Sequence, residues 1–237
     1  MSDLKKSVWI TGASSGIGKQ LTIEFAKNGE TVLATARRTS LIENYSKELG
    51  EFSKNIIPFE VNVSDVPSIQ NFFNSLSEKF FVSALINNAG ITSFKPAEKD
   101  SLQEIKEIVD TNLLGSIYAI KTVLPAMIEN NSGTIINILS VVTQKVFTGS
   151  SAYSASKAGL KAYADSLREE IRKNNIRVIN ILPGAAKTAI WHTSVLEKHS
   201  HRMMSPEDIA KFVYQVYSQK NNLVAEEIVM RPLQGDI

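Results

Sequence analysis

A glycine-rich turn stands close to the start of the chain: Thr11-Gly12-Ala13-Ser14-Ser15-Gly16-Ile17-Gly18. An apolar run at 7–11, typical of a strand, precedes it, and a helical segment at 16–28 follows. Glycines in this position let the backbone turn tightly and approach a pyrophosphate held at the helix N-terminus. This context predicts a nucleotide-binding fold, whereas the glycines alone would also fit an ordinary strand–helix turn of small residues.

The phosphate loop of nucleoside triphosphatases is the main alternative for this turn. Gly18-Lys19 is similar to the end of that motif. However, Ala13 stands where the motif has its first glycine, and Gln20 stands where it has a metal-binding serine or threonine. The turn therefore favours a dinucleotide over a nucleoside triphosphate.

Apolar runs alternate with helical segments along the rest of the chain. Strands are predicted at 7–11, 31–36, 56–61, 84–87, 133–139, 177–182 and 227–230. Helices are predicted at 16–28, 40–50, 66–80, 101–129, 151–174 and 206–219. Most strand runs are continuously apolar, which is typical of strands covered on both faces. This predicts an α/β fold of Rossmann type, with a doubly wound, seven-stranded parallel sheet and helices on both faces.

A single domain over residues 1–237 is expected, because no repeat or linker interrupts the pattern. The least patterned stretch, 189–204, is predicted to form a lid over the substrate at the carboxyl end of the sheet. The hydrophobic share of 43% and the charged share of 21% argue against extensive disorder.

Charge and cysteine content limit the partners of the chain. The net charge is +2 and the basic residues form no tract, so a nucleic-acid partner is not expected. The chain has no cysteine, which excludes disulfides and thiolate chemistry and fits a reducing compartment. The apolar run near residue 9 is too short for a signal sequence or a membrane span. We therefore expect a cytoplasmic protein with no membrane partner.

The end of the second strand reads Thr35-Ala36-Arg37-Arg38. A cofactor with a free ribose 2′-hydroxyl requires a carboxylate acceptor at this place, whereas a 2′-phosphate requires a guanidinium. Ala36 supplies no carboxylate, and Arg37 and Arg38 supply two cations. The pair favours NADP(H) as cofactor over NAD(H), although a basic pair alone could also be a solvated surface feature.

Further short motifs follow in order along the chain. They are Asn87-Asn88-Ala89-Gly90 after the fourth strand, Asn112 in the long helical segment, Ser140 after the fifth strand, Tyr153-Ser154-Ala155-Ser156-Lys157, and Pro183-Gly184 followed by Thr188. With the glycine turn, this series resembles the short-chain dehydrogenase/reductase family, in its short, non-extended branch and its NADP(H)-preferring type. Each motif alone is weakly specific, but the whole series in order is highly specific.

The resemblance implies a catalytic group of Asn112, Ser140, Tyr153 and Lys157. It also implies a cofactor site along the carboxyl edge of the sheet. The residues expected in that site are Gly12, Ser14, Ser15, Gly16, Ile17, Gly18, Arg37, Arg38, Asn62, Val63, Asn88, Ala89, Gly90, Tyr153, Lys157, Pro183, Gly184 and Thr188. In the family, the residue matched by Thr188 contacts the nicotinamide carboxamide, and the residue matched by Lys157 binds the nicotinamide ribose.

One position departs from the family pattern. The family commonly has an aspartate after the third strand, where this chain has Asn62. Asn62 keeps an acceptor oxygen for the adenine but lacks the charge, so a weaker contact is expected. Asp65, three residues further on, is predicted to cap the following helix.

Tyr153 and Lys157 lie four residues apart on a predicted helix, so their side chains share one face. Tyrosine has an ordinary pKa of about 10, and an adjacent ammonium favours the phenolate and lowers that pKa. We therefore expect Tyr153 to act as a general acid in reduction and as a general base in oxidation. By their spacing alone, the two residues would also fit an exposed pair on a surface helix.

Ser140 ends the fifth strand, and the loop that follows can bring its hydroxyl and that of Tyr153 to one carbonyl oxygen. No histidine is near Ser140 in the sequence and no Gly-x-Ser-x-Gly motif surrounds it. We therefore expect it to orient the substrate as a hydrogen-bond donor and not to act as a nucleophile. The alternative is an ordinary polar residue at a strand end.

Asn112 lies inside a predicted helix, where asparagine is unfavourable because its amide competes for backbone hydrogen bonds. Gly115 weakens the same segment, so a local irregularity of the helix is predicted. The resemblance implies that Asn112 holds a water molecule that connects Lys157 to solvent. The alternative is a capped or solvent-facing amide.

The substrate-binding residues are predicted to be Ser140, Val142, Phe147, Ala185 and Trp191. These are mainly apolar and no arginine cluster is expected to face them, which favours a small-to-medium apolar ketone or aldehyde. The three histidines fit no structural zinc pattern, so no metal is expected; they are His192, His199 and His201.

The resemblance and the residues together predict an NADPH-dependent carbonyl reductase or alcohol dehydrogenase. Two alternatives stay open: a sensor protein that binds NADP(H) without catalysis, and an NAD-linked dehydrogenase. The resemblance also implies a homodimer or homotetramer formed through the two long helices. The small residues Ala155, Ala158 and Ala162 would permit close packing of one of these helices.

Overall fold

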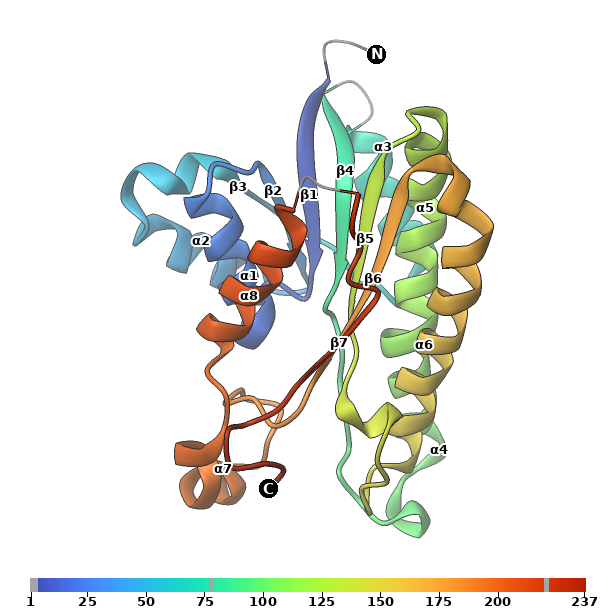
Figure 1. Ribbon diagram of the computed structural model, residues 1–237. Helices are drawn as coiled ribbons and strands as arrows, with labels where there is room; N and C mark the ends of the chain where they lie inside the picture. Colours follow the sequence, from blue (N-terminus) through green and yellow to red (C-terminus); the bar gives the residue numbers. More distant parts are fainter. Residues whose placement is uncertain (1–3, 77–78, 220–221) are drawn as a thin grey trace.

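The structure, a computed structural model, describes residues 4–76, 79–219 and 222–237. Across these ranges, seven strands form one parallel sheet in the order β3-β2-β1-β4-β5-β6-β7 (Figure 1). Their bounds are β1 Lys5–Thr11, β2 Val32–Ala36, β3 Ile56–Glu60, β4 Phe80–Asn87, β5 Gly133–Ile138, β6 Ile176–Pro183 and β7 Glu227–Met230. The strand order reverses between β1 and β4, and a parallel sheet forms a ligand crevice at the carboxyl ends of such neighbours.

Helices cover both faces of the sheet. They are α1 Gly16–Lys27, α2 Thr39–Lys47, α3 Val66–Leu76, α4 Leu102–Val109, α5 Gly115–Glu129, α6 Ser151–Ile171, α7 Thr193–His199 and α8 Pro206–Tyr217. Apolar residues of α1, α2 and α8 pack on one face of the sheet, and those of α3, α5 and α6 pack on the other (Figure 1). The predicted doubly wound arrangement is therefore confirmed.

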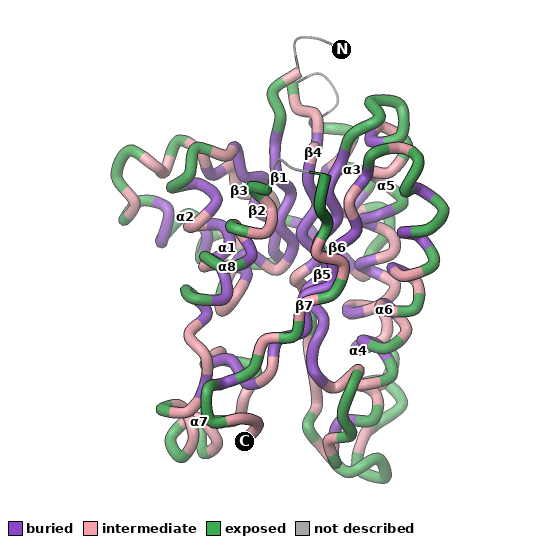
Figure 2. The backbone as a smooth tube through the Cα atoms, in the orientation of Figure 1, coloured by how far each residue is buried: buried purple, intermediate pink, exposed green. Residues whose placement is uncertain are grey.

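The central strands are buried along most of their length. All five residues of β2 and all six of β5 are buried, and β1 is exposed only at its first two residues. Figure 2 shows this buried centre, with exposed residues gathered on the outer sides of the helices. The continuously apolar strand pattern in the sequence follows from this double cover.

The segment predicted as one helix at 101–129 is interrupted. Between α4 and α5, a π-helical turn spans Asp110–Leu114 and contains the buried Asn112. Gly115 follows, and a Cβ on it would lie 2.9 Å from the backbone oxygen of Val63. The predicted irregularity is confirmed, and Gly115 also permits a close approach of the helix to the loop after β3.

The same run, Leu102–Glu129, is long and apolar enough to cross a membrane by length and composition alone. Its apolar residues include Ala119, Ile120 and Val123, which are buried against the sheet and its neighbouring helices. The high hydropathy of this run is therefore explained by its place in the core.

Most predicted boundaries shift by one to three residues, and the strand predicted at 84–87 begins earlier, at Phe80. Two further differences are larger. The stretch 189–204 was expected to be irregular, but it contains α7 and a short 3-10 turn at Ser200–Arg202. Backbone pairing of Ala186 with Met204 closes this stretch at its base. The helix predicted at 66–80 ends earlier, because β4 begins at Phe80; residues 77–78 lie outside the described ranges.

Candidate active site

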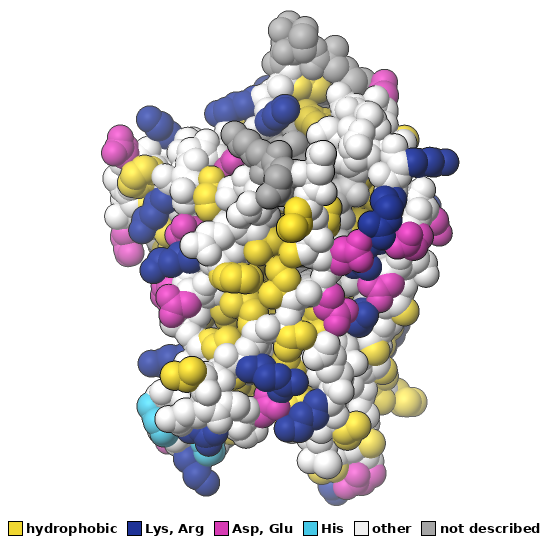
Figure 3. All heavy atoms as spheres, in the orientation of Figure 1, with side chains coloured by type: hydrophobic (Ala, Val, Ile, Leu, Met, Phe, Trp, Pro, Cys, Tyr) yellow, Lys and Arg dark blue, Asp and Glu magenta, His cyan; other side chains and the backbone are white. Residues whose placement is uncertain are grey.

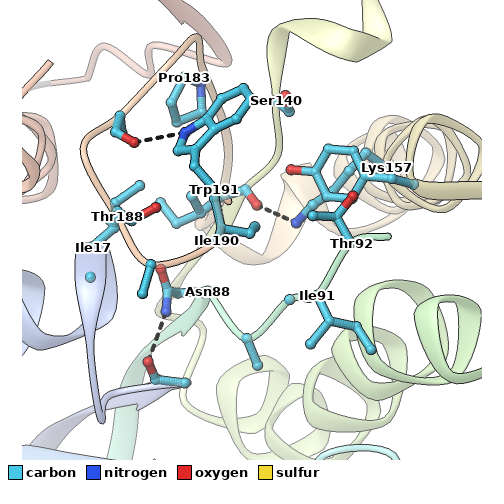
Figure 4. A pocket seen from close by; sticks show the side chains of 18 of the residues that line it. Ile17, Asn88, Ile91, Thr92, Ser140, Lys157, Pro183, Thr188, Ile190 and Trp191 are labelled. Carbon is cyan, nitrogen blue, oxygen red and sulfur yellow. Dashed lines mark hydrogen bonds between the residues drawn. The ribbon is translucent and has the colours of Figure 1, made fainter. Parts of the chain in front are cut away.

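The carboxyl ends of the strands open into a cleft of about 750 Å³. It runs from the N-terminus of α1, past the ends of β4 and β5, to the stretch after β6 and to residues 236–237. Figure 4 shows Ile17 and Thr188 on one side of this pocket and Lys157 on the opposite side. Except for Gly18 and Asn112, every cofactor, catalytic and substrate residue named from the sequence lines the cleft.

The glycine turn is locked against the end of β4. Gly12 has φ +67°, and a Cβ on it would lie 2.8 Å from Cα of Ala89. The Asn88 side-chain amide donates hydrogen bonds to the carbonyl oxygens of Thr11 at 2.9 Å and Gly12 at 3.2 Å. Gly18 supports this turn from behind, since a Cβ there would lie 2.3 Å from the Gly12 oxygen. The backbone is thus fixed in a cradle that side chains would fill.

This cradle fits a pyrophosphate. Ser14, Ser15, Gly16 and Ile17 line the cleft where α1 begins, and the first amides of a helix have no partner within it. Such amides, with the positive end of the helix dipole, bind phosphate groups. Gly16 has φ +56°, and a Cβ on it would lie 3.2 Å from the Thr188 methyl carbon, so Thr188 closes over the turn.

Arg37 and Arg38 line the cleft directly after β2, and both are exposed. Within the ranges described, neither guanidinium forms an ion pair with a carboxylate. The adjoining Ala36 is buried and leaves no acid at this end of the cleft. Two uncommitted cations fit the 2′-phosphate that distinguishes NADP(H) from NAD(H).

Asn62 also lines this end of the cleft. Its side-chain oxygen accepts hydrogen bonds from the backbone amide of Ser64 at 3.3 Å and from the Ser64 hydroxyl at 2.9 Å. The predicted acceptor oxygen is therefore already engaged in the loop. Asp65 accepts a bond from the Ser68 amide at 3.0 Å at the start of α3, which confirms it as a helix cap.

Tyr153, Lys157 and Ser140 converge on the middle of the cleft, and all three are buried. The Lys157 amine donates a 2.8 Å hydrogen bond to the Ile138 carbonyl oxygen and lies 5.8 Å from the centroid of the Tyr153 ring (Figure 4). The Ser140 hydroxyl forms a hydrogen bond with the Tyr153 phenol. The sequence alternative of an exposed Tyr–Lys pair is therefore wrong.

Burial has the largest effect on the pKa values of Tyr153 and Lys157. It raises the pKa of Tyr153 to about 12, against the opposing effect of the hydrogen bond with Ser140. Burial also lowers the pKa of Lys157 to about 8. The pKa of Tyr153 is therefore raised and not lowered as the sequence analysis expected, because desolvation of the phenol is the largest effect. At neutral pH the phenol holds its proton, as a general acid must.

Asn112 is fully buried behind the cleft wall and has no contact with solvent. Its amide nitrogen donates to the Ile91 carbonyl oxygen at 2.9 Å and to the Ser156 hydroxyl at 3.0 Å, and its oxygen accepts from the Ile91 amide at 2.8 Å. These bonds tie the loop after β4 to the catalytic helix α6. A Cβ on Gly90 would lie 3.4 Å from the Asn112 oxygen and 3.5 Å from the Lys157 nitrogen, so both side chains lie close to Gly90.

The substrate end of the cleft has apolar walls. Val142, Phe147, Ala185 and Trp191 line it, as the sequence predicts. The Trp191 indole donates a 3.0 Å hydrogen bond to the Ala186 carbonyl oxygen, which fixes the ring (Figure 4).

Phe94 was missed by the sequence analysis. Its ring stacks on that of Trp191, with centroids 4.7 Å apart and an interplanar angle of 9°. Phe94 follows the Asn-Asn-Ala-Gly motif closely, which could have pointed to it. Its left-handed backbone, with φ +46°, was not readable from the sequence.

Residues 236–237 also line the cleft, although no motif marks them. Asp236 forms ion pairs with Lys145 at 3.0 Å and with Arg231 at 2.5 Å. Lys145 and Arg231 do not themselves line the cleft, so the expectation that no arginine cluster faces the substrate residues is not contradicted. Lys145 is far in sequence from the segment that carries Arg231 and Asp236, so sequence spacing could not bring these charges together.

The family model described as short chain dehydrogenase matches residues 6–199. The chain belongs to this family. The match covers the glycine turn, the Asn-Asn-Ala-Gly motif and the Ser140, Tyr153 and Lys157 group, and it ends inside the stretch that carries α7.

Relatives of the short-chain dehydrogenase family match the chain over nearly its whole length. A sepiapterin reductase of Chlorobaculum tepidum is 32% identical, and the alignment covers 99% of both chains. An NADP-dependent 3-hydroxy acid dehydrogenase of Schizosaccharomyces pombe is 31% identical, over 96% of this chain and 92% of the relative. A solved structure of the closed form of serine dehydrogenase complexed with NADP+ has a TM-score of 0.89 at 29% identity, over 97% of this chain and 96% of that one.

Proposed function

We propose that this enzyme, an NADP(H)-dependent oxidoreductase of hydroxyl and carbonyl groups, reduces a small-to-medium apolar ketone or aldehyde or oxidises the corresponding alcohol. The observation that carries the proposal is the convergence of Ser140, Tyr153 and Lys157 in one cleft. Relatives with NADP in their names or bound in their structures support the choice of cofactor.

The cofactor is expected to lie along the carboxyl edge of the sheet. The amides at the start of α1 would bind the pyrophosphate, and Arg37 and Arg38 would bind the 2′-phosphate. Asn62 and Val63 would lie beside the adenine, and Thr188 beside the nicotinamide carboxamide. When bound, NADPH supplies the hydride for reduction, and NADP+ accepts it in oxidation.

Ser140 and Tyr153 act together on the substrate oxygen in our mechanism. Both hydroxyls would hydrogen-bond the carbonyl oxygen, which polarises the carbonyl and orients it. Tyr153 then donates its proton to that oxygen as the alcohol forms. The raised pKa of Tyr153, about 12, keeps this proton on the phenol until the substrate oxygen gains charge.

Lys157 and Asn112 support the proton donor in different ways. The Lys157 amine lies between the Ile138 carbonyl and the Tyr153 ring, where it can bind the nicotinamide ribose and return a proton to the phenol. Asn112 positions the Ile91 backbone and α6 through three hydrogen bonds. In our mechanism, a water molecule near Asn112 links Lys157 to solvent.

The substitution Tyr153→Phe tests this function. It removes the proton donor and keeps the ring, so kcat for ketone reduction should fall about 1000-fold, within the range for general acids. The dissociation constant for NADPH should change little. Tyr163→Phe on the same helix, at a residue that does not line the cleft, is the matched control. Full turnover by Tyr153→Phe would contradict the mechanism, and no turnover of any carbonyl by the unsubstituted enzyme would favour a non-catalytic sensor.

We also propose a homodimer or homotetramer that resides in the cytoplasm and uses no metal. Ala155, Ala158 and Ala162 are exposed along α6, where a second copy could pack closely. The substitution Ala158→Arg should reduce the mass measured by light scattering, and an unchanged mass would argue against this face as the interface.

A further inference from the structure

Two basic side chains hold one carboxylate at the edge of the cleft, and a third holds the backbone beside it. The Arg231 guanidinium lies 2.5 Å from both carboxylate oxygens of Asp236, and the Lys145 amine lies 3.0 Å from one of them. The Arg202 guanidinium donates longer hydrogen bonds to the carbonyl oxygens of Gln234, at 3.4 Å, and Asp236, at 3.3 Å. We call Lys145, Arg202 and Arg231 the mouth cluster.

The mouth cluster carries more positive charge than its partner neutralises. Asp236 is the carboxylate that pairs with Lys145 and Arg231. Arg202 forms no ion pair with a carboxylate in the part of the chain that the structure describes, and its Nε atom is buried without a hydrogen-bond partner there. A buried, unpaired donor on a cation is unfavourable, so the cluster retains the capacity for a further anion.

Asp236 stands between the mouth cluster and the cleft. Asp236 lines the cleft, whereas the three basic residues do not, and its side chain is only 14% exposed. Lys145 also lies 5.4 Å from the ring centroid of Phe147, which is itself part of the substrate wall. Figure 3 shows basic side chains around an acidic one on the lower part of this face, below an apolar area. A carboxylate that replaced Asp236 would therefore be bound from inside the cleft.

The side chain of Asp236 is held by ion pairs that another carboxylate could form in its place. Leu233 is fully exposed and Gln234 is exposed, while Pro232 is buried. The segment turns at Gly235, whose amide donates to the Pro232 carbonyl oxygen at 2.8 Å. The hydrogen bond with Lys145 and the pairing with Arg231 lower the pKa of Asp236, so it is an anion at neutral pH. Exchange for a substrate carboxylate would keep the number of ion pairs unchanged.

We propose that the mouth cluster is a carboxylate-binding subsite, which Asp236 fills until a substrate carboxylate replaces it. The substrates that fit are oxo acids and hydroxy acids with an apolar chain between the reacting carbon and the carboxylate. The chain lies against the apolar walls formed by residues such as Phe147 and Trp191, and the reacting oxygen lies at Ser140 and Tyr153. This inference rests on the proposed carbonyl reduction and adds no chemical step to it, but it extends the substrates from apolar ketones to ketones that carry a carboxylate at the far end of an apolar chain.

Paired substrates that differ only in charge provide the first test. We would measure kcat/KM with NADPH for 4-oxopentanoate and 5-oxohexanoate, each beside its methyl ester, and take the acid-to-ester ratio. Arg231→Met or Lys145→Met should lower the ratio about tenfold, because each removes a charged partner of the acid. Asp236→Asn should raise the ratio, because it removes the charge of the competing group. Lys121→Met, an exposed lysine on α5 that does not line the cleft, is the control and should leave the ratio unchanged.

Binding without turnover provides the second test. Calorimetry of the NADP+-loaded enzyme should show a higher affinity for pentanoate than for methyl pentanoate. The affinity for pentanoate should rise in Asp236→Asn and fall in Arg231→Met. Equal pentanoate affinity in all variants would overturn the proposed subsite. So would an acid-to-ester ratio of kcat/KM that none of the substitutions changes. If no ketone is turned over while pentanoate binds as expected, the proposed function fails and the subsite stands.

Discussion

The two ends of the cleft are built in different ways. At the cofactor end, backbone groups at the ends of β1 and β4 form the surface, and glycines at 12 and 18 permit contacts that a Cβ would block. At the substrate end, side chains from segments far apart in sequence meet, as in the Phe94–Trp191 stack and the Asp236 ion pairs. A backbone cradle depends on short motifs, whereas the substrate wall depends on long-range packing.

This difference has a functional consequence. Substitutions at the cofactor end should weaken NADPH binding for every substrate alike. Substitutions at the substrate end should change the preference among substrates while NADPH affinity stays constant. Ser140 and Lys157 lie where the two ends meet. Substitutions there should change catalysis or stability to a similar extent for all substrates.

The largest expected effect concerns Lys157, at this junction. Its pKa of about 8 in the folded protein lies below its ordinary value of 10.5 because of burial. The unfolded chain therefore binds more protons between these two values, and stability should rise as pH increases from 8 toward 10.5. The contribution is at most about 3 kcal/mol, at 1.36 kcal/mol for each pKa unit.

Denaturant unfolding of the unsubstituted enzyme and of Lys157→Met across this pH range measures the contribution. Only the difference between the two free energies of unfolding is attributed to Lys157, since other lysines titrate in both proteins. A difference that stays constant from pH 8 to pH 10 would mean that Lys157 is not desolvated. The comparison is best made below pH 10, because the raised pKa of Tyr153 makes stability fall between pH 10 and 12.

Ser140→Ala should have the next largest effect. The substitution removes a hydroxyl that hydrogen-bonds Tyr153 and, in our mechanism, the substrate oxygen. We expect kcat to fall about 100-fold for acids, esters and neutral ketones alike, as for the loss of one oxyanion donor. Steady-state kinetics over such a panel is the measurement. A loss confined to one substrate would place Ser140 in the substrate wall alone and not at the junction.

Arg37→Ala tests the cofactor end with a smaller effect. Loss of a charge-assisted bond to the 2′-phosphate should weaken NADPH binding about tenfold and leave NADH binding nearly unchanged. Fluorescence titration with both cofactors measures this selectivity. An equal loss of affinity for NADH and NADPH would show that Arg37 has a general structural role. No loss of affinity for either cofactor would reopen the alternative of an NAD-linked dehydrogenase. Arg172→Ala, in the short 3-10 turn Arg172–Asn174 that follows α6, is a suitable control.

Phe94→Ala should have the smallest effect. It removes a stacked ring from the substrate wall, and aromatic pairs of this kind contribute about 1 kcal/mol beyond the area they bury. We expect a several-fold change in KM that differs among ketones, with unchanged NADPH affinity. Phe212→Ala, at a residue on α8 that does not line the cleft, is the control. If Phe94→Ala also lowered the affinity for NADPH, the cofactor end and the substrate end of the cleft would not be independent.

Much of the fold was predictable because its signals are local. The apolar runs located the strands, and the glycine turn located the crossover from β1 to α1. Asn112 and Gly115 indicated the irregular turn between α4 and α5, since both residues are unfavourable within a helix. The end of α3 was predicted too late, because Phe80 continues the helical spacing of Ile69, Phe72 and Leu76. The helix α7 was missed, because it is short and buries none of its residues.

By itself, the sequence determined the order of strands and helices, the cofactor cradle and the identity of the Ser140, Tyr153 and Lys157 group. Residue type and spacing along one strand or helix are sufficient for these features. Only the tertiary structure decided that burial raises the pKa of Tyr153, that Phe94 stacks on Trp191 and that Asp236 meets Lys145 and Arg231. Desolvation and contacts between distant segments depend on how the whole chain packs, and no short pattern of residues encodes them.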